Sequence, residues 1–171
     1  MGLTPLEGLV MGTRSGDVDP AIPAYLVREL GLSMEEIDHA LNSAAGLKGL
    51  AGENDFRELS RLRAAGDERA GLAFDVYCHR IRKYVGAYFA VLGTVDAVVF
   101  TAGVGEHSAD VRAAALAGLE RLGITIDHDR NSAPATGARR ISTADSAVTV
   151  FVVPTNEEWQ IAREALGVVR A

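Results

Sequence analysis

Cysteine and histidine are scarce in this sequence, and their scarcity excludes two ways of stabilising a fold. Cys78 is the only cysteine among 171 residues, so no disulfide can form within the chain. Free thiols are typical of the reducing cytoplasm, where we expect the protein to work. The histidines do not show the spacing of a zinc site; they are His39, His79, His107 and His128.

Long apolar runs and an excess of positive charge are also missing. No stretch approaches the ~20 apolar residues that a membrane-spanning helix needs. The 17 Lys and Arg are outnumbered by 23 Asp and Glu, which leaves a net charge of −6. Because nucleic-acid-binding proteins present a basic face, we expect neither a nucleic acid nor a membrane among the partners.

The remaining composition is that of an ordinary globular protein, with 48% hydrophobic and 23% charged residues. The length favours a single domain over residues 1–171. Hydrophobic periodicity and capping residues predict helices over residues 5–10, 20–30, 34–43, 56–65, 67–92, 109–122 and from 156 onwards. Short apolar runs predict strands over residues 97–100, 123–126 and 148–153, with polar loops over 12–19, 44–53 and 129–137. The later half therefore has the order β-α-β-β-α, which is typical of an α/β sheet with helices outside.

The most informative stretch, residues 101–108, follows the predicted strand 97–100 and contains Gly103 and Gly105. It predicts a tight glycine turn, followed by a helix with Ser108 at its N-cap. Glycines let the backbone approach a ligand closely, and a helix N-terminus offers free N–H groups and partial positive charge. This combination suits a nucleotide, although an ordinary strand-to-helix turn without a ligand has the same pattern.

The same glycines keep a dinucleotide-binding oxidoreductase open as an alternative. Gly103, Gly105 and Ser108 have the spacing of the dinucleotide fingerprint, except that its third position is Gly or Ala. That fingerprint also needs an acidic residue about twenty positions further on, after the next strand. Asp127 follows the predicted strand 123–126 at about that distance. This interpretation would make the chain an NAD-dependent domain.

An arginine in a second loop suits phosphate chemistry. Arg14 lies between Gly12 and Gly16, and an arginine in such a loop can bind an anion with two hydrogen bonds. A surface arginine paired with Asp17 or Asp19 is the alternative.

Two carboxylates, Glu157 and Glu158, follow the predicted strand 148–153 at the start of the last helix. Ligands gather at the carboxyl ends of strands in α/β sheets, and Mg²⁺ prefers oxygen ligands. Both acids could instead complement the helix dipole. Thr155 and Glu158 have the spacing of a capping box, so Glu157 is the carboxylate left for a metal ion.

Three separated segments resemble those of the acetate kinase family, which includes the propionate kinases. They are residues 1–8 together with 11–20, residues 100–106 and residues 153–158, and Asp55-Phe56-Arg57 matches a fourth. Their order and spacing match over essentially the whole chain. The resemblance implies an RNase-H-like, actin-like ATPase domain. This is the α/β fold of sugar kinases, actin and chaperone ATPases, which surrounds a nucleotide cleft.

Only the second domain of that family is resembled. The family's first domain supplies an Asn-rich phosphate loop, a catalytic Asp, a catalytic His and an acetate-binding Arg, and the sequence has no counterpart of these. We therefore expect the chain to be the C-terminal nucleotide-binding domain of a longer enzyme, as a fragment or the product of a split gene. Alone, it should have poor activity.

The resemblance also implies roles for individual residues. Arg14 would stabilise charge on the phosphoryl group during transfer, and Pro5 would line the pocket for the acetate methyl group. Glu157 would help to hold Mg²⁺, and His107 stands where the family usually has Asn. The adenosine of ATP or ADP would lie against two segments: Asp55, Phe56 and Arg57, and Gly103, Val104, Gly105, Glu106 and His107.

The implied function is direct phosphoryl transfer between ATP and acetate, giving ADP and acetyl phosphate, by a cytoplasmic homodimer. A propionate kinase, an NAD-dependent oxidoreductase and a non-catalytic module that retains the kinase fold remain alternatives. The apolar stripe of residues 67–92 would serve either the core or the dimer interface. The kinase interpretation requires Arg14, Gly103 and Glu157 to converge on one wall of a cleft.

Overall fold

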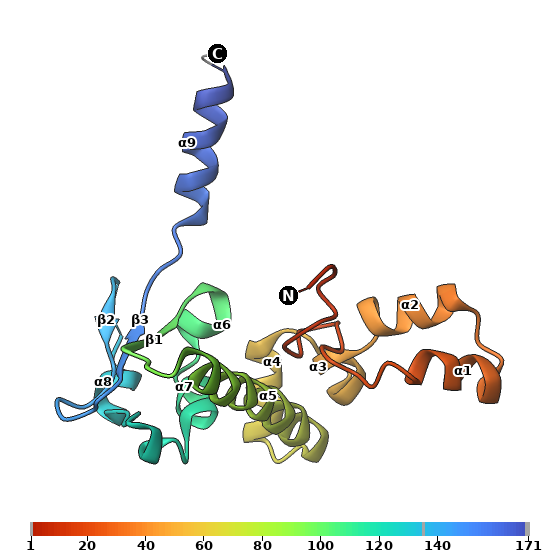
Figure 1. Cartoon of the computed structure of the whole chain (residues 1–171), viewed down its shortest axis with the longest axis horizontal. Helices are drawn as coiled ribbons and strands as arrows, with labels where there is room; N and C mark the ends of the chain where they lie inside the picture. Colours follow the sequence, from red (N-terminus) through yellow and green to blue (C-terminus); the bar gives the residue numbers. More distant parts are fainter. Residues whose placement is uncertain (1, 135, 170–171) are drawn as a thin grey trace. The chain divides into compact units, whose positions relative to one another are not determined.

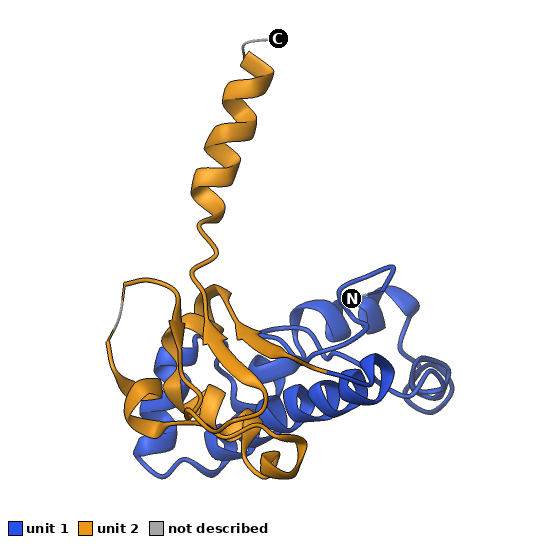
Figure 2. Cartoon of the chain, turned by 60° about the vertical axis from the view of Figure 1, so that its left-hand side comes forward, with its two compact units in different colours: residues 1–94 blue, residues 95–171 orange. Residues whose placement is uncertain are grey.

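The computed structural model describes residues 2–134 and 136–169 of the chain. The chain divides into two compact units, residues 1–94 and residues 95–171, which Figure 2 colours separately. The described part of the first unit consists of helices and loops, whereas the second unit contains the sheet (Figure 1). The single domain predicted from the length stays a prediction.

The helices of the first unit begin and end largely where the capping residues predict. Gly31 closes the first helix in the left-handed conformation. Ser33 and Glu36 form a reciprocal capping box at the start of the second, and Asp67 accepts a hydrogen bond from the Ala70 amide at the start of the last. The five helices are α1 (Ile22–Leu30), α2 (Met34–Ser43), α3 (Gly46–Ala51), α4 (Phe56–Ala64) and α5 (Glu68–Leu92).

Helix α5 organises the core of the first unit. It runs unbroken for 25 residues, as its apolar period predicts. Helices α3 and α4 pack against it, and the buried cluster consists of Leu47, Leu59, Ala70 and Ala73, with the ring of Tyr77 packed against it. The beginning of the apolar stripe therefore serves the core, while Tyr88, Val91 and Leu92 near its end are exposed.

The second unit is built around a small mixed sheet of order β1-β3-β2. Strand β3 (Thr149–Val152) pairs in parallel with β1 (Ala97–Phe100) and antiparallel with β2 (Arg139–Arg140). Val150 and Val152 of β3 are buried in the core of the unit. The remaining elements are α6 (Ala102–His107), α7 (Ala109–Leu116), the 3₁₀ helix η1 (Glu120–Leu122), α8 (His128–Ser132) and α9 (Glu157–Val169).

Helix α9 has a different character from the other elements of this unit. It extends away from the sheet in Figures 1 and 2, and none of its described residues is buried. None of the helices described in residues 2–134 and 136–169 combines the length and apolar character needed to cross a bilayer.

Several predicted elements of the first unit are wrong, and each error has a physical reason. Residues 5–10 form turns and bends rather than a helix, and Gly8 within them has φ +121°, which a right-handed helix does not allow. Residues 44–53 contain helix α3 instead of a continuous loop. Three glycines favoured the loop, but Gly46 has φ +61° and lies where a Cβ would meet the Met11 carbonyl oxygen at 2.1 Å.

The second unit also departs from the predicted elements. The helix predicted to end at 122 ends at Leu116, because Ala117 leaves the helical conformation with ψ 133° and Gly118 follows with φ +81°. Residues 123–126 form no strand, and Ile126 makes a single bridge to Ser142. The loop predicted over 129–137 contains most of α8, which Asp127 caps; residue 135 lies outside the described residues.

We predict that Leu59→Ala destabilises the first unit by about 2–5 kcal/mol, since it removes buried methyl groups and leaves a cavity. The side chain of Leu59 is 1% exposed. Leu72→Ala is the matched control, because the same change falls on a residue that is 56% exposed and should cost under about 0.5 kcal/mol. Urea unfolding followed by far-ultraviolet circular dichroism measures both, and equal losses would contradict the core assignment.

Candidate functional site

A cavity of about 460 Å³ opens in the second unit between two segments that follow the parallel strands. It is lined by Ala102, Gly103, Glu106 and His107 of α6 and by residues 154–159. Because β1 and β3 are parallel, the segments after their carboxyl ends meet at one edge of the sheet, where ligands bind in α/β folds. Gly103, Glu106, His107 and Glu157, all predicted as site residues, therefore share one cavity.

Thr155 and Glu106 form the polar network of this cavity. The Glu106 carboxylate accepts hydrogen bonds from the Thr155 amide at 3.0 Å and the Thr155 hydroxyl at 2.9 Å. The Thr155 hydroxyl accepts in turn from the Ala102 amide at 2.9 Å and lies 2.8 Å from the Thr101 hydroxyl. The bonds from Thr155 hold the pKa of Glu106 below its ordinary value of 4.5.

Two strained residues line the same cavity. Ala102 and Asn156 have φ 59° and 49° and are the only non-glycine residues with positive φ in the described part of the chain. Such a conformation costs about 1–3 kcal/mol and persists only where surrounding contacts impose it. The Ala102 amide bonds to Thr155, and Asn156 directly follows Thr155. The hydrogen bonds of Thr155 with Ala102 and Glu106 therefore lie beside two strained residues at one cavity. Such a combination is typical of functional sites.

The predicted capping box at the start of α9 is wrong. Helix α9 begins at Glu157, so its N-cap position is Asn156 and Thr155 lies one residue too early. The Thr155 hydroxyl bonds to Glu106, 49 residues away in sequence, and not to Glu158. Glu157 and Glu158 both line the cavity, so Glu158 is not set apart from Glu157 by a role as a capping residue.

The two glycines of α6 have different surroundings, and neither forms the predicted tight turn. Residues 102–107 are a short helix. At Gly103 a Cβ would meet no atom within 4 Å, so a side chain there would extend into the open cavity. At Gly105 a Cβ would lie 3.4 Å from the Phe100 backbone, which lets α6 pack closely on β1. Val104 does not line the cavity, and the predicted N-cap at Ser108 is confirmed for α7.

In the first unit, helix α3 positions the loop that carries Arg14. The amides of Leu47 and Lys48, in the first turn of α3, donate to the carbonyls of Met11 at 3.0 Å and Gly12 at 2.9 Å. Gly46 makes this close approach of the two backbones possible. Helix α3 and its support of Arg14 were not predicted from the sequence, because its glycine cluster, typical of a loop, serves close packing instead.

Arg14 itself is poorly satisfied. Its Nε atom is buried with no hydrogen-bond partner, its Nη1 lies 3.9 Å from the Met11 sulfur, and it forms no ion pair with any residue that the structure describes. The alternative of an arginine paired with Asp17 or Asp19 is therefore wrong. Asp17 instead accepts from the Tyr84 hydroxyl and the Gly8 amide, each at 2.6 Å.

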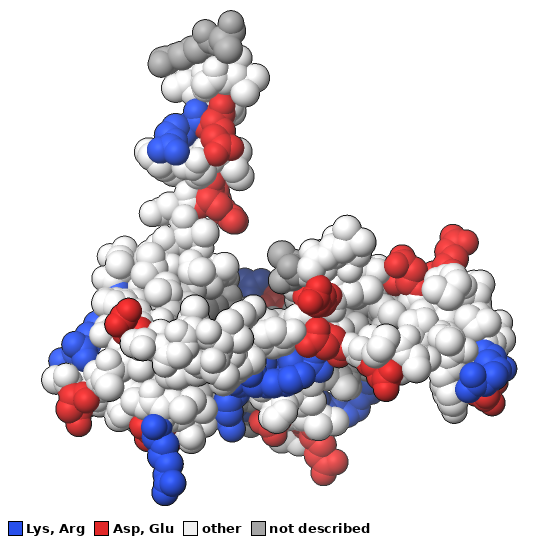
Figure 3. Space-filling model, in the orientation of Figure 1, with Lys and Arg blue, Asp and Glu red and all other residues white. Residues whose placement is uncertain are grey.

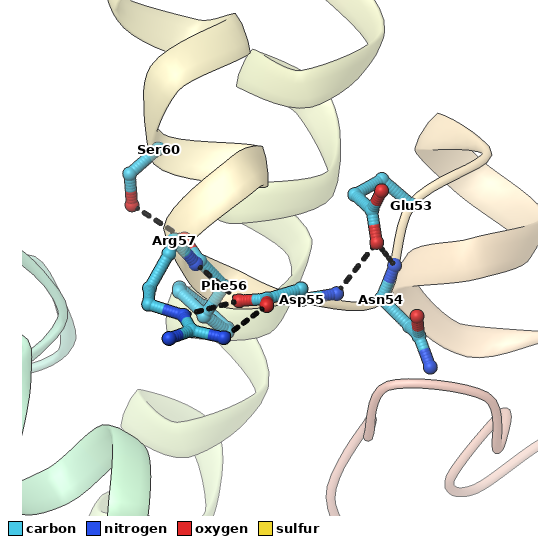
Figure 4. A network of polar contacts seen from close by, with 6 residues as sticks. All are labelled: Glu53, Asn54, Asp55, Phe56, Arg57 and Ser60. Carbon is cyan, nitrogen blue, oxygen red and sulfur yellow. Dashed lines mark hydrogen bonds and ion pairs between the residues drawn. The ribbon is translucent and has the colours of Figure 1, made fainter.

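The segment Asp55-Phe56-Arg57 forms a self-contained helix start (Figure 4). Asp55 caps α4 by accepting from the Arg57 amide, and the Arg57 side chain returns to the same carboxylate at 2.7 Å. This contact lowers the pKa of Asp55 to about 2. The Phe56 ring packs edge-on against Tyr77, with centroids 4.9 Å apart, so its position follows from the core.

The site residues predicted from the sequence therefore fall into two groups. Pro5, in a segment of turns, shares the first unit with Arg14 and with Asp55, Phe56 and Arg57, whereas the second unit holds the α6 residues and Glu157. The structure brings Gly103 and Glu157 together. The convergence of Arg14 on the same cleft stays a prediction.

The surface charge and the candidate metal ligands complete the description of the site. On the face drawn in Figure 3, a contiguous group of Lys and Arg side chains lies near the centre, and the others are scattered among Asp and Glu; the chain as a whole has a net charge of −6. Among the described residues, no three His, Cys, Asp or Glu side chains form a cluster able to hold a metal ion.

The fold contradicts the alternative of a dinucleotide-binding oxidoreductase domain. Residues before Asp127 form no strand, and the Asp127 carboxylate caps α8 and pairs with Arg130 at 3.2 Å. It is therefore not the acid that follows a second strand and binds a ribose.

A cavity at the carboxyl edge of parallel strands, walled by a glycine-containing helix and carboxylates, defines an α/β enzyme-like ligand-binding fold. Known proteins of similar sequence and structure show the family to which this fold belongs. The model of the acetokinase family matches residues 1–163, and the chain belongs to this family. The predicted resemblance and fold class are thereby confirmed.

Individual relatives agree with this assignment. The chain is 60% identical over 169 residues to an acetate kinase of Streptomyces coelicolor. The aligned region spans 99% of this chain and 42% of that protein. The crystal structure of the Porphyromonas gingivalis acetate kinase superimposes with a TM-score of 0.91 at 43% identity, over 99% of this chain and 43% of that one. A propionate kinase from Francisella tularensis gives a TM-score of 0.88 at 47% identity, over 96% of this chain and 42% of that one. The chain thus spans less than half the length of these relatives.

We predict that Thr155→Val raises the pKa of Glu106 towards 4.5, because it removes the hydroxyl donor that lowers this pKa most. A lowered carboxylate pKa contributes stability above pH 4.5 that is lost as the pH falls through the lowered value. The variant should therefore lose less stability on acidification.

Carbon-13 NMR titration of the Glu106 carboxyl group measures this shift. Thr149→Val makes the same change in β3 and should leave the pKa of Glu106 where it is. An unshifted pKa in Thr155→Val would show that the hydroxyl bond does not form in solution.

Proposed function

We propose that this chain is the nucleotide-binding part of a kinase that transfers a phosphoryl group directly between ATP and acetate, giving ADP and acetyl phosphate. The observation that carries the proposal is the cavity in which Gly103, Glu106, His107 and Glu157 meet, in a chain of the acetokinase family. Because the chain spans about 42% of its curated relatives, the complete reaction would draw on further protein.

The nucleotide would occupy the cavity of the second unit. A volume of about 460 Å³ lies within the range of small-molecule sites, and Gly103 leaves space where a side chain would otherwise stand. His107 can donate a hydrogen bond to the nucleotide as a neutral imidazole. Asp55, Phe56 and Arg57 would complete the adenosine contacts, with the exposed guanidinium of Arg57, held by its pair with Asp55, facing the ligand.

Arg14 would stabilise the transferred phosphoryl group. In phosphoryl transfer the protein mainly positions the reactants and compensates charge on the equatorial oxygens. A guanidinium has five donors arranged to meet such oxygens in pairs. The buried Nε of Arg14 has no hydrogen-bond partner and its guanidinium forms no ion pair with a described residue, so binding an anion would not require an ion pair to break.

The residues at the cavity fit Mg²⁺. Glu157 and Glu158 supply carboxylate oxygens, which this ion prefers, and Mg²⁺ bound with substrate phosphates uses one or two carboxylates and keeps several waters. The absence of a three-ligand cluster among the described residues agrees with that mode. When bound, the ion would supply positive charge beside the phosphates, with Glu157 as its protein ligand.

Acetate is the preferred acyl substrate in this proposal. A curated relative at 60% identity is an acetate kinase, which supports this choice. The apolar ring of Pro5 would favour a short acyl chain. We further propose that the enzyme works in the cytoplasm as a homodimer, supported by the single cysteine and by the exposed apolar residues Tyr88, Val91 and Leu92 of α5.

Trp159 provides a direct test of nucleotide binding, because it is the only tryptophan and lines the cavity. We predict that ADP changes its fluorescence, that Mg²⁺ tightens the binding, and that NAD⁺ gives no comparable response. Glu157→Gln should abolish the effect of Mg²⁺, whereas Glu158→Gln, one position further on the same helix, should retain it.

The outcomes of this titration separate the parts of the proposal. A response to NAD⁺ without one to ADP would refute nucleotide binding of the kinase type. Loss of the Mg²⁺ effect in Glu158→Gln alone would assign the metal to that carboxylate instead.

We also predict that the isolated chain turns over far more slowly than the 1–10³ s⁻¹ typical of enzymes, because much of the transition-state contact lies outside it. A coupled assay that detects ADP formed from ATP and acetate measures this rate. Turnover within that range would show that these 171 residues are a complete enzyme.

A further inference from the structure

Arg112 of α7 is a buried cation without a carboxylate partner among the described residues. Only 1% of the Arg112 surface is exposed. Its Nε and Nη2 donate to the side-chain and backbone oxygens of Asn131 in α8, each at 2.7 Å. Its Nη1 donates to the carbonyls of Gly105 at 2.9 Å and Glu106 at 3.0 Å. Burial lowers the pKa of this guanidinium.

These contacts connect three short helices at one point. Gly105 and Glu106 lie in the last turn of α6, where the carbonyls carry partial negative charge and attract a cation. Asn131 in turn donates to the Ala109 carbonyl at 2.9 Å in the first turn of α7. Arg112 thus fixes the C-terminal end of α6 against α7 and α8.

Helix α6 depends on such anchors. It has six residues, and isolated helices much longer than this are only marginally stable in water. Its beginning is held by the bond from the Ala102 amide to Thr155, and its end by Arg112. Gly103, Glu106 and His107, which line the cavity, lie between these two anchors.

The choice of arginine at this place needs an explanation beyond packing. An apolar side chain of similar volume would fill the space without the cost of burying a charge, but it would leave the oxygens of Gly105, Glu106 and Asn131 without these donors. What the guanidinium adds is direction, since its planar fork reaches oxygens on two helices at once.

We propose that Arg112 is a positioning residue for the nucleotide, which holds α6 in the orientation that lets the cavity accept it. This inference rests on the proposed function. Arg112 does not line the cavity, so it acts through α6 and not by contact with the ligand.

The test compares Arg112→Met with the unmodified chain by two measurements. Methionine keeps most of the apolar volume and removes the bonds to Gly105 and Glu106. Titration with ADP, followed by Trp159 fluorescence below the unfolding temperature, should show about 3–10-fold weaker binding. Hydrogen exchange without nucleotide should be faster at the amides of residues 105–108.

Arg140→Met is the matched control. Arg140 also donates to backbone carbonyls, those of Thr143 and Ala144, but in a loop that does not line the cavity. This variant should keep the ADP affinity of the unmodified chain even if it lowers the unfolding temperature. Should Arg112→Met fail to fold, Arg112→Lys, which keeps the charge but has a single ammonium group, decides by the same two measurements.

Each outcome supports or overturns the inference. Weaker ADP binding with faster exchange in α6, in a folded Arg112 variant, supports it. Unchanged ADP affinity in such a variant overturns it and leaves the proposed function intact. If the unmodified chain does not bind ADP, the proposed function fails and the positioning role fails with it.

Discussion

The parallel pairing of β1 with β3 is the interaction on which the candidate site depends. These strands are separated by about fifty residues of chain, and their pairing sets Ala97 opposite Thr149 and Phe100 opposite Val152. Both strands therefore end at the same level, and the Val153 amide continues the ladder by donating to the Phe100 carbonyl. Without this register the two walls of the cavity would not face one another.

Local signals in the sequence were sufficient where the stabilising partner is also local. The capping box of Ser33 and Glu36, the left-handed Gly31 and the long period of α5 all involve residues within a turn or two of each other. The fold class and the family came from motifs spread along the chain, and the comparisons confirm both.

The errors occurred where the partner is distant. Thr155 has the local spacing of a cap, yet its hydroxyl bonds to Glu106 from another element. Gly46 belongs to a glycine cluster typical of a loop, yet its lack of a Cβ lets the start of α3 meet the Met11 carbonyl. The role of Arg112 had no signal in the sequence, because an arginine in an amphipathic helix is ordinarily a surface residue.

Two arginines of this chain show opposite solutions to the same electrostatic problem. Arg112 is deeply buried and satisfies its donors with four oxygen atoms of the protein. Arg14 is less buried and leaves its Nε without an acceptor. Protein acceptors on all three nitrogen atoms suit a structural anchor, and a nitrogen without an acceptor suits a group that meets a ligand.

The exposure of α9 has a thermodynamic consequence for the cavity. A helix of 13 residues with no buried side chain gains little from tertiary packing, and a helix of this length is marginal in water. Its first turn nevertheless carries Glu157, Glu158 and Trp159, which form one wall of the cavity. Any contact that favours the helical form of this segment would therefore also favour ligand binding, and by linkage a bound ligand would increase the helical population of α9 by the same free energy.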